Sequence, residues 1–401
     1  MSTTILRGAL AAGAAMLALS VPAVAAGATA PAAMPSTGRR ASSTTTDAAN
    51  PAAVFALPRP TGPHPVGTTV LHLVDDSRPD PWVPEEKARE LMVSLWYPAK
   101  APSGRRAPYM TMKEAALVLK GLEARAVPAN AVRLSRTRTN ASLDAAPLGR
   151  ERGLPLVVLS PGFTVPRSSL TALAEDLASK GYVVAGIDHT YESFGTSLPG
   201  GRTATCVACK SVDLPGLVKV TRTRVADVSF VLDRLTGPNP AWKGGGLIDT
   251  SRIGMAGHSI GGNSATWTML GDRRFRAGIN MDGTFFIPLP EKGLSRPFLM
   301  LGAGKIHQPG GGDTSWGRDW KRMTGWKRWI TFDGMEHRSF CDYPLFAQQL
   351  GLKLDSSLSG PRTVEVLRAY VGAFFDLHLR KQSRPLLDRA SRRYPEVRFW
   401  R

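Results

Sequence analysis

The sequence is poor in cysteine and in aromatic residues, and it lacks any internal repeat. Three of its 401 residues are cysteine, and Phe, Trp and Tyr together make up 7% of the chain. Gly (40) and Pro (31) are frequent but follow no Gly-x-y period, which excludes a collagen-like fibre, and the lack of a repeat excludes a solenoid. With 43% hydrophobic residues, the chain can fill the core of a globular enzyme.

Metal-ligand patterns are also scarce. Cys206 and Cys209 have the spacing of zinc and redox sites, but no second pair of Cys or His accompanies them. We therefore predict no metal and no cofactor. Together with Cys341 they allow one disulfide and one free thiol, and the sequence does not indicate which two residues pair.

Long apolar runs are absent except near the N-terminus. There, Arg7 precedes an apolar stretch from Ala9 to Ala26 that ends in small residues. This pattern is typical of a secretory signal peptide, residues 1–26, so we expect a secreted protein that is cleaved near Ala25 or Ala26. An uncleaved membrane anchor is the alternative, but the many alanines make the stretch only weakly apolar.

Acidic residues are outnumbered by basic ones. The chain has 32 Asp and Glu against 51 Lys and Arg, a formal charge of +19 that becomes +18 when the segment carrying Arg7 is removed. Such a charge favours contact with an anionic membrane surface, although a solvated cationic surface is the simpler interpretation. No basic tract is interleaved with stacking aromatic residues, so we expect no specific nucleic-acid binding.

Three regions follow one another along the chain. Residues 27–52 are rich in Ala, Ser, Thr and Pro, which is typical of a flexible leader. Residues 53–401 alternate short β-rich runs with helical patterns, which predicts an α/β domain whose mostly parallel central sheet carries helices on both faces. Residues 104–150 interrupt this alternation, and we expect them to form an insertion over the sheet. A lid or an acyl-binding wall is one interpretation of it, and an insertion without a functional role is the other.

The periodicity predicts individual elements of this domain. The expected strands are Leu91–Tyr97, Leu156–Leu159, Val183–Ile187, Ile253–Ala256, Gly278–Met281, Phe298–Leu301 and Trp329–Phe332. The expected helices are Ser168–Lys180, Arg222–Leu235, Gly261–Leu270 and Val364–Leu379.

The strongest motif is Gly-x-Ser-x-Gly at Gly257-His-Ser-Ile-Gly261. It lies between a strand pattern and a helix pattern, which is the setting of a nucleophile elbow. In such an elbow a sharp turn exposes the serine hydroxyl, and the flanking residues must be small because neighbouring elements pack closely. We predict that Ser259 is a catalytic nucleophile.

A serine hydroxyl is a weak nucleophile until a base removes its proton, so an oriented histidine should follow Ser259. Three histidines lie beyond it. His307 falls in a Gly-rich stretch and His378 in the C-terminal helical pattern, whereas His337 falls in the loop directly after the last predicted parallel strand. We therefore predict that His337 is the base.

Two aspartates could orient that histidine. Asp282 follows a predicted strand immediately, whereas Asp313 comes about a dozen residues after the next strand, in a Gly-rich loop. An orienting carboxylate needs a fixed backbone, and a strand end provides one better than such a loop. We predict Asp282 as the acid, with Asp313 as the alternative.

Ester hydrolysis also needs backbone donors that bind the oxyanion. One is the N–H of Ile260, which follows the nucleophile. The other is the N–H of Phe163 in Ser160-Pro-Gly-Phe163, which follows the first long central strand.

These motifs resemble the platelet-activating factor acetylhydrolase family of α/β-hydrolases, in its plasma type. The likeness covers most of residues 62–340. It rests on the elbow Gly257-His-Ser-Ile-Gly-Gly262, on the run from Arg273 to Gly283 that contains the acid, and on separations of 23 residues from Ser259 to Asp282 and 55 from Asp282 to His337. Further matches are Gly62-Pro-His-Pro-Val-Gly67-Thr68, Asp76-Ser-Arg78 and Trp96-Tyr-Pro98.

The resemblance implies an α/β-hydrolase fold and hydrolysis, without a metal, of esters with short or oxidised acyl chains through a serine acyl-enzyme. Family members usually have His-Gly where this chain has Pro161-Gly162. Because proline has no N–H, any hydrogen bond that the family's histidine makes from its backbone is lost here. Secreted triacylglycerol lipases and polyester hydrolases have Pro-Gly-Phe at this place, so they are the alternative.

The sequence thus predicts a secreted serine esterase that acts on short-chain acyl esters or on phospholipid sn-2 acyl groups. A triacylglycerol lipase or polyester hydrolase is the first alternative. A cationic envelope- or nucleic-acid-binding protein on an inactive hydrolase scaffold is a hypothesis from another class. No pattern predicts the acyl chain length, the alcohol or the oligomeric state.

Overall fold

The computed structural model describes residues 54–400. The predicted signal peptide, its cleavage site and the predicted leader lie outside these residues. None of the helices within 54–400 is both long and apolar enough to cross a bilayer.

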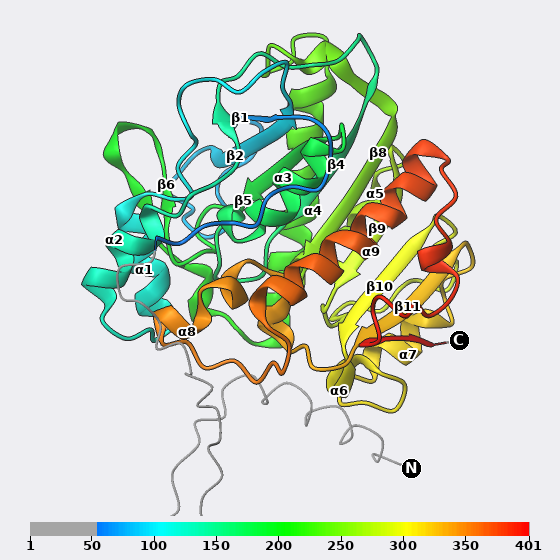
Figure 1. The fold of residues 1–401 in the computed structure, drawn as a ribbon. Helices are drawn as coiled ribbons and strands as arrows, with labels where there is room; N and C mark the ends of the chain where they lie inside the picture. The colour runs from blue at the N-terminus through cyan, green and yellow to red at the C-terminus, as the bar shows by residue number, and fades with distance from the viewer. Residues whose placement is uncertain (1–53, 401) are drawn as a thin grey trace, which may run out of the picture. The chain divides into compact units, whose positions relative to one another are not determined.

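A single large sheet organises residues 54–400 (Figure 1). Its ten strands run in the order β12-β11-β10-β9-β8-β4-β5-β2-β1-β3. The six strands from β11 to β5 are parallel, β2 and β12 are antiparallel to their inner neighbours, and β1 is antiparallel to β2. The strands are β1 (Val66–Asp75), β2 (Arg89–Pro98), β3 (Ser142–Leu143), β4 (Leu154–Ser160), β5 (Val183–Asp188), β8 (Ile248–His258), β9 (Phe275–Met281), β10 (Phe298–Ala303), β11 (Lys327–Phe332) and β12 (Val397–Trp400).

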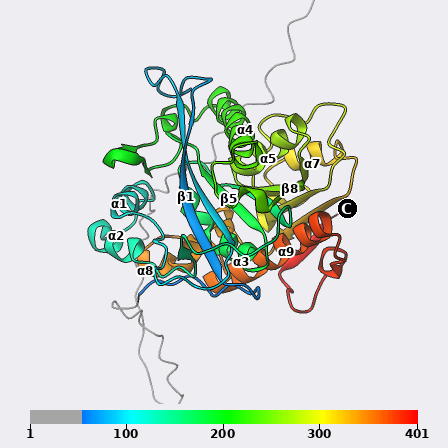
Figure 2. The same cartoon turned by 90° about the horizontal axis from the view of Figure 1, so that it is seen from above.

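Helices cover both faces of this sheet, as expected (Figure 2). Helices α3 and α9 pack on one face, and α4 and α5 pack on the other. The helices are α1 (Met112–Gly121), α2 (Val127–Ser135), α3 (Thr171–Ser179), α4 (Leu214–Thr236), α5 (Ile260–Gly271), α6 (Gly304–His307), α7 (Ser315–Trp320), α8 (Ala347–Leu350) and α9 (Gly360–Arg380). This architecture confirms the predicted α/β-hydrolase fold.

The central strand β4 shows how the sequence produces two cores. Successive side chains of a strand point to opposite faces, so alternate residues enter different layers. Val157 and Leu159 are buried with α3 and α9, whereas Leu156 and Val158 are buried with α4 and α5. Each fully buried side chain of this size contributes about 1.5–3 kcal/mol to folding. Because both faces of β4 are buried, its sequence is a continuous apolar run.

Residues 104–150 supply α1, α2 and β3. Strand β3 pairs with β1, so this insertion extends the β1 edge of the sheet, with α1 and α2 beyond that edge (Figure 2). Thr111 begins α1 with a capping box formed with Glu114. The insertion also contacts the loop after β5, because Glu114 accepts a hydrogen bond from the Ser197 N–H.

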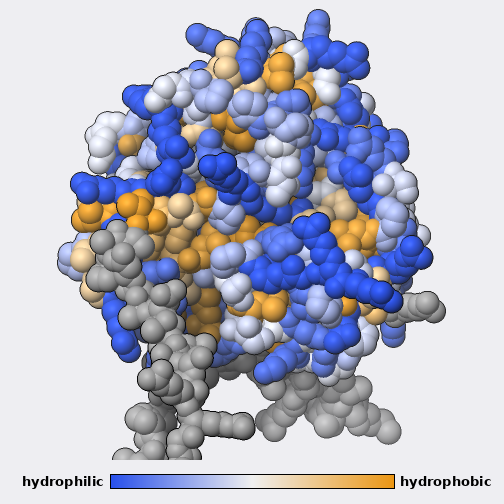
Figure 3. Space-filling view, in the orientation of Figure 1, coloured by the Kyte–Doolittle hydropathy of each residue, from blue (hydrophilic) through white to orange (hydrophobic). Residues whose placement is uncertain are grey.

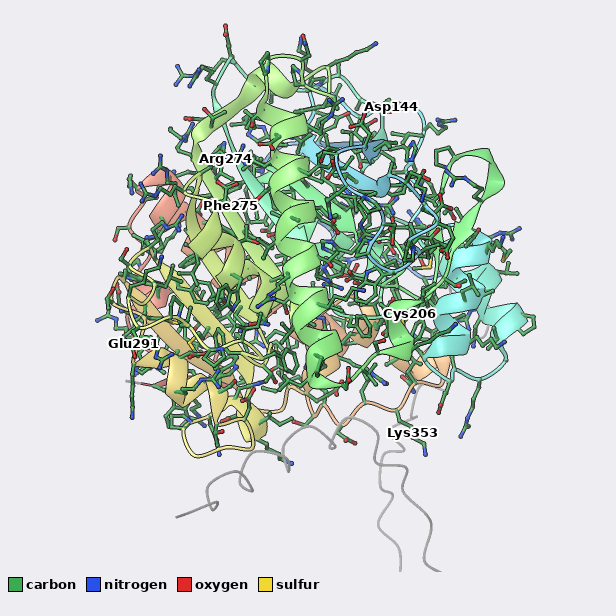
Figure 4. The ribbon with its side chains drawn as sticks, turned by 180° about the vertical axis from the view of Figure 1, so that it is seen from behind. Asp144, Cys206, Arg274, Phe275, Glu291 and Lys353 are labelled. Atoms are coloured by element: carbon green, nitrogen blue, oxygen red, sulfur yellow. A yellow bond between two sulfur atoms is a disulfide. The ribbon has the colours of Figure 1, made fainter. Side chains whose placement is uncertain are left out.

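The cysteine pairing that the sequence left open is resolved here. Cys206 and Cys209 form a disulfide in the loop that leads from the short hairpin β6 (Thr196–Ser197) and β7 (Thr203–Ala204) toward α4 (Figure 4). Cys341 is the remaining thiol, and burial raises its pKa to about 12. A thiol with such a pKa is not a nucleophile at neutral pH.

Because the central strands are parallel, the loops that follow them meet at one edge of the sheet. The loops after β4, β5, β8, β9, β10 and β11 all start from this edge. It is the place where the residues predicted to carry out the chemistry gather.

Candidate active site

Ser259 occupies a sharp turn between β8 and α5. Its φ of 56° and ψ of −127° are rare for a residue with a side chain, so the surrounding structure must hold this strained conformation. Two backbone hydrogen bonds do so: the Ser259 N–H donates to the Met281 carbonyl at 2.8 Å, and the Gly262 N–H donates to the Ser259 carbonyl at 2.8 Å.

The glycines around Ser259 are required by close backbone contacts. A Cβ on Gly257 would lie 2.0 Å from the Gly261 carbonyl oxygen, and a Cβ on Gly261 would lie 2.3 Å from the Ser160 carbonyl oxygen. A Cβ on Gly262 would meet the Asn280 side chain at 2.0 Å. These contacts are the packing reason that the sequence motif implied.

The three residues predicted as nucleophile, base and acid form one hydrogen-bonded row. The Ser259 hydroxyl lies 2.9 Å from Nε2 of His337, and Nδ1 of His337 lies 2.7 Å from Oδ2 of Asp282. An ionised carboxylate can only accept, so Nδ1 of His337 carries the proton and its Nε2 is free to accept the serine proton. His337 is one third exposed and Asp282 is fully buried.

Asp282 leaves β9 with a φ of 59° and is held as an ion. Burial alone would raise its pKa, but the charge and hydrogen bonds of His307 and His337 hold that pKa well below its usual value. The Ala303 N–H also donates to Oδ1 at 2.6 Å. Asp313, the alternative acid, does not reach His337. Its Oδ2 lies instead 3.1 Å from Nε2 of His307.

The predicted oxyanion donors belong to two turns at the same edge. Ile260 begins α5 directly after Ser259, and Phe163 lies in the turn after β4. That turn is pinned on its far side, because the Thr164 N–H donates to the Glu192 carbonyl and the Phe194 N–H donates to the Thr164 carbonyl. Among residues 54–400, neither the Phe163 nor the Ile260 N–H is paired with a protein acceptor, so both are available to a ligand.

Sequence reasoning missed a buried polar chain behind the Phe163 turn. Arg224 of α4 donates to the Pro161 carbonyl and, at 3.2 Å, to the Ser160 hydroxyl. The Ser160 hydroxyl lies 3.0 Å from Nε2 of His189, and Nδ1 of His189 lies 2.8 Å from Asp227. Burial and the charge of Arg224 lower the pKa of His189 to about 4, so its neutral ring accepts from Ser160 and donates to Asp227.

His258, the residue before the nucleophile, is a second group that the sequence analysis did not identify. Its Nε2 donates to the carbonyl of His337 at 2.9 Å, which ties the backbone of the predicted base to the end of β8. Burial, with the nearby His337, lowers the pKa of His258 to about 3, so its ring is neutral. A Cβ on Gly162 would lie 2.9 Å from this ring, which explains the small residue there.

Within the part of the chain that the structure describes, no group of three or more His, Cys, Asp or Glu is arranged to hold a metal ion. The site offers three groups joined by hydrogen bonds: a hydroxyl, an imidazole that can take its proton, and a buried anion that orients this imidazole. Two amide donors lie on the turns that flank the hydroxyl. Such an arrangement can transfer an acyl group.

The packing of the elbow predicts opposite effects for two glycine-to-alanine substitutions. Gly261→Ala places a methyl group against the Ser160 carbonyl and should lower the free energy of unfolding by about 2 kcal/mol or more. Gly317→Ala in α7 meets nothing within 4 Å and should raise it by about 0.5 kcal/mol. Urea unfolding measures both changes, and equal stabilities for the two variants would contradict the packing described here.

Comparisons with known proteins fit this geometry. The model of the family described as platelet-activating factor acetylhydrolase, isoform II, matches residues 51–199 and 242–371, more than half of the chain. A probable 1-alkyl-2-acetylglycerophosphocholine esterase from Arthroderma benhamiae is 28% identical over 375 residues, which cover 86% of this chain and 94% of the relative. A bis(hydroxyethyl) terephthalate hydrolase from Streptomyces coelicolor is 32% identical over 152 residues, 37% of this chain and 38% of the relative.

Among solved structures, the ferulic acid esterase from Streptomyces cinnamoneus is 45% identical and superposes with a TM-score of 0.77, covering 87% of this chain and 100% of that chain. These relatives share hydrolysis of carboxylic esters, which is the activity of this chain as well. The chain belongs to the family of platelet-activating factor acetylhydrolase, isoform II.

Proposed function

We propose that this protein is a secreted serine esterase that works through an acyl-enzyme. The observation that carries the proposal is the unbroken hydrogen-bond row from the Ser259 hydroxyl through His337 to the buried Asp282. In the first half-reaction, His337 Nε2 takes the serine proton while Oγ attacks the acyl carbonyl. The resulting imidazolium then gives that proton to the leaving alcohol.

In the second half-reaction, His337 removes a proton from water, which attacks the acyl group on Ser259 and releases the acid. Asp282 stabilises the imidazolium in both halves without taking its proton. The N–H groups of Phe163 and Ile260 bind the oxyanion that forms each time. Each donor stabilises the transition state by about 3 kcal/mol.

We propose short-chain acyl esters or phospholipid sn-2 acyl groups as substrates. The relative from Arthroderma benhamiae, named for an acetylglycerophosphocholine substrate, supports this choice. The insertion lies next to this part of the site. The Phe194 N–H donates to the Thr164 carbonyl beside the Phe163 turn, and the Phe194 ring packs on Gly121 of α1, where an added Cβ would lie 2.5 Å from it. This contact makes α1 a candidate wall of the acyl site.

A polyester or aromatic ester hydrolase is the second candidate. The relatives named terephthalate hydrolase and ferulic acid esterase favour it, as does Pro161. The third hypothesis, a binding protein on an inactive scaffold, is disfavoured because the relatives are esterases and Ser259 is hydrogen-bonded to His337.

Secretion and contact with an anionic membrane surface are also parts of the proposal. The Cys206–Cys209 disulfide fits an oxidising compartment. Large apolar side chains are exposed at Val212 and Leu214, at the start of α4, and at Ile306 in α6, the helix that follows β10. On the face shown in Figure 3, hydrophilic side chains cover much of the surface, with apolar areas between them. The formal charge of the whole chain is +19, which favours contact with an anionic surface.

Ser259→Ala tests the mechanism. The substitution removes the nucleophile, so turnover of p-nitrophenyl butyrate should fall by at least about 10⁴-fold while the circular dichroism spectrum stays unchanged. Ser229→Ala on α4 is the matched control and should hydrolyse the ester at the normal rate, because within residues 54–400 the Ser229 hydroxyl hydrogen-bonds Asp272 and none of the residues proposed for the mechanism. A Ser259→Ala protein with normal turnover would remove the proposed mechanism.

A substrate series tests the acyl specificity. We expect kcat/KM to fall as the p-nitrophenyl acyl chain lengthens beyond about six carbons, and a phospholipid with an sn-2 acetyl group to be cleaved faster in anionic than in zwitterionic vesicles. Faster cleavage of methyl ferulate and bis(hydroxyethyl) terephthalate than of every short aliphatic ester would favour the second candidate instead.

A further inference from the structure

His307 lies beside the site but has no part in the mechanism described so far. It ends the short helix α6, which follows β10 directly at the edge that carries Ser259 (Figure 1). The ring is buried and stacks on Trp316, with ring centres 4.3 Å apart. Its carbonyl accepts a hydrogen bond from the Trp329 indole at 2.6 Å, so both the backbone and the ring are fixed.

Both ring nitrogens of His307 face carboxylates. Nδ1 lies 2.6 Å from Oδ1 of Asp282, and Nε2 lies 3.1 Å from Oδ2 of Asp313. An ionised carboxylate has no proton to donate, so each of the two hydrogen bonds needs a proton on the ring. A neutral imidazole carries only one such proton. The two contacts together therefore select the doubly protonated imidazolium.

The surroundings favour that cation. Burial alone would lower the pKa of His307, but the charges and hydrogen bonds of Asp282 and Asp313 raise it to about 9. The face of Trp316 adds a favourable site for a positive ring.

Other charged groups lie on α6 itself and on the neighbouring elements α7 and β11. Lys305 lies on α6 itself, while Asp319 of α7 is paired with Arg318, and Asp333 after β11 is paired with Arg398. His337 lies on the far side of Asp282.

We propose that His307, as an imidazolium, is a positioning residue that holds and partly neutralises the carboxylate orienting the catalytic base. This inference rests on the proposed serine mechanism. His307 and the Ala303 N–H occupy Oδ1 of Asp282, which leaves Oδ2 for His337. With three donors around it, the carboxylate cannot rotate away from His337 without losing a charge-assisted hydrogen bond.

The charge of His307 also tunes the base. A cation on one oxygen of Asp282 weakens the pull of the other oxygen on the imidazolium of His337. Asp313 offsets part of this effect because it lies against the opposite side of the same ring. Removing the cation and removing Asp313 should therefore move the pH dependence of the esterase activity in opposite directions.

The first test uses His307→Asn and Asp313→Asn. The asparagine Nδ2 takes the place of Nδ1 and keeps a donor for Asp282 but has no charge. In pH profiles of kcat/KM for p-nitrophenyl butyrate, His307→Asn should move the acidic limb upward by about one pH unit, and Asp313→Asn should move it downward. The double variant, in which both charges are removed, should return close to the wild-type limb.

A purely structural role for His307 would lower activity without moving the limb, or would move it in the same direction in both single variants. Either result overturns the proposal. A double variant that shows the simple effect of His307→Asn alone would also overturn it, since the charge of Asp313 would then have no influence.

The second test does not depend on activity and uses the wild-type fold. Long-range ¹H–¹⁵N spectra of ¹⁵N-histidine protein, with His307 assigned by its loss in His307→Asn, should show both ring nitrogens protonated at pH 7 and deprotonation near pH 9. A neutral tautomer at pH 7 would overturn the inference. If Ser259→Ala is inactive and the His307 ring is neutral, this inference fails but the serine mechanism stands. If Ser259→Ala is fully active, the serine mechanism fails whatever the spectra show.

Discussion

The buried carboxylate of Asp282 is the group on which the rest of the site depends. An ion in a protein interior costs several kcal/mol unless it is well paired, so its position must be over-determined. It accepts hydrogen bonds from His337, His307 and the Ala303 N–H. Asn280 holds the turn that follows it by bonding both the N–H and the carbonyl of Gly283. The anion is thereby fixed at the exit of β9.

The Ser259 turn and the turn after β4 are anchored at the same edge of the sheet. The strained Ser259 is tied to the end of β9 through the Met281 carbonyl, so the proposed nucleophile and the proposed acid share one backbone connection. On the other side, Arg224 and His189 hold the turn after β4 from behind. The parallel strands thus place the hydroxyl, the anion and the proposed oxyanion donors, while the polar chains beneath them fix their orientation.

The sequence predicted those parts of the structure that depend on local pattern. Two-sided burial makes strands such as β4 visible as apolar runs, and the close contacts of Gly257 and Gly261 make the elbow visible as a motif. It did not reveal β12, because a four-residue edge strand carries little periodic signal. Nor did it reveal the roles of Arg224 and His307, whose partners come from other elements of the fold. The Gly-rich sequence around His307 gives no sign that its ring is buried between two aspartates.

We propose that the row from Asp282 through His337 gives the hydroxyl of Ser259 a reactivity that other serines lack. Treatment with a fluorophosphonate, followed by peptide mass mapping of the adduct, measures this reactivity directly. We expect a single adduct, on the peptide that contains Ser259, together with complete loss of esterase activity. An inactivated protein whose adduct lies on another residue, or an active esterase that takes up no label, would contradict it.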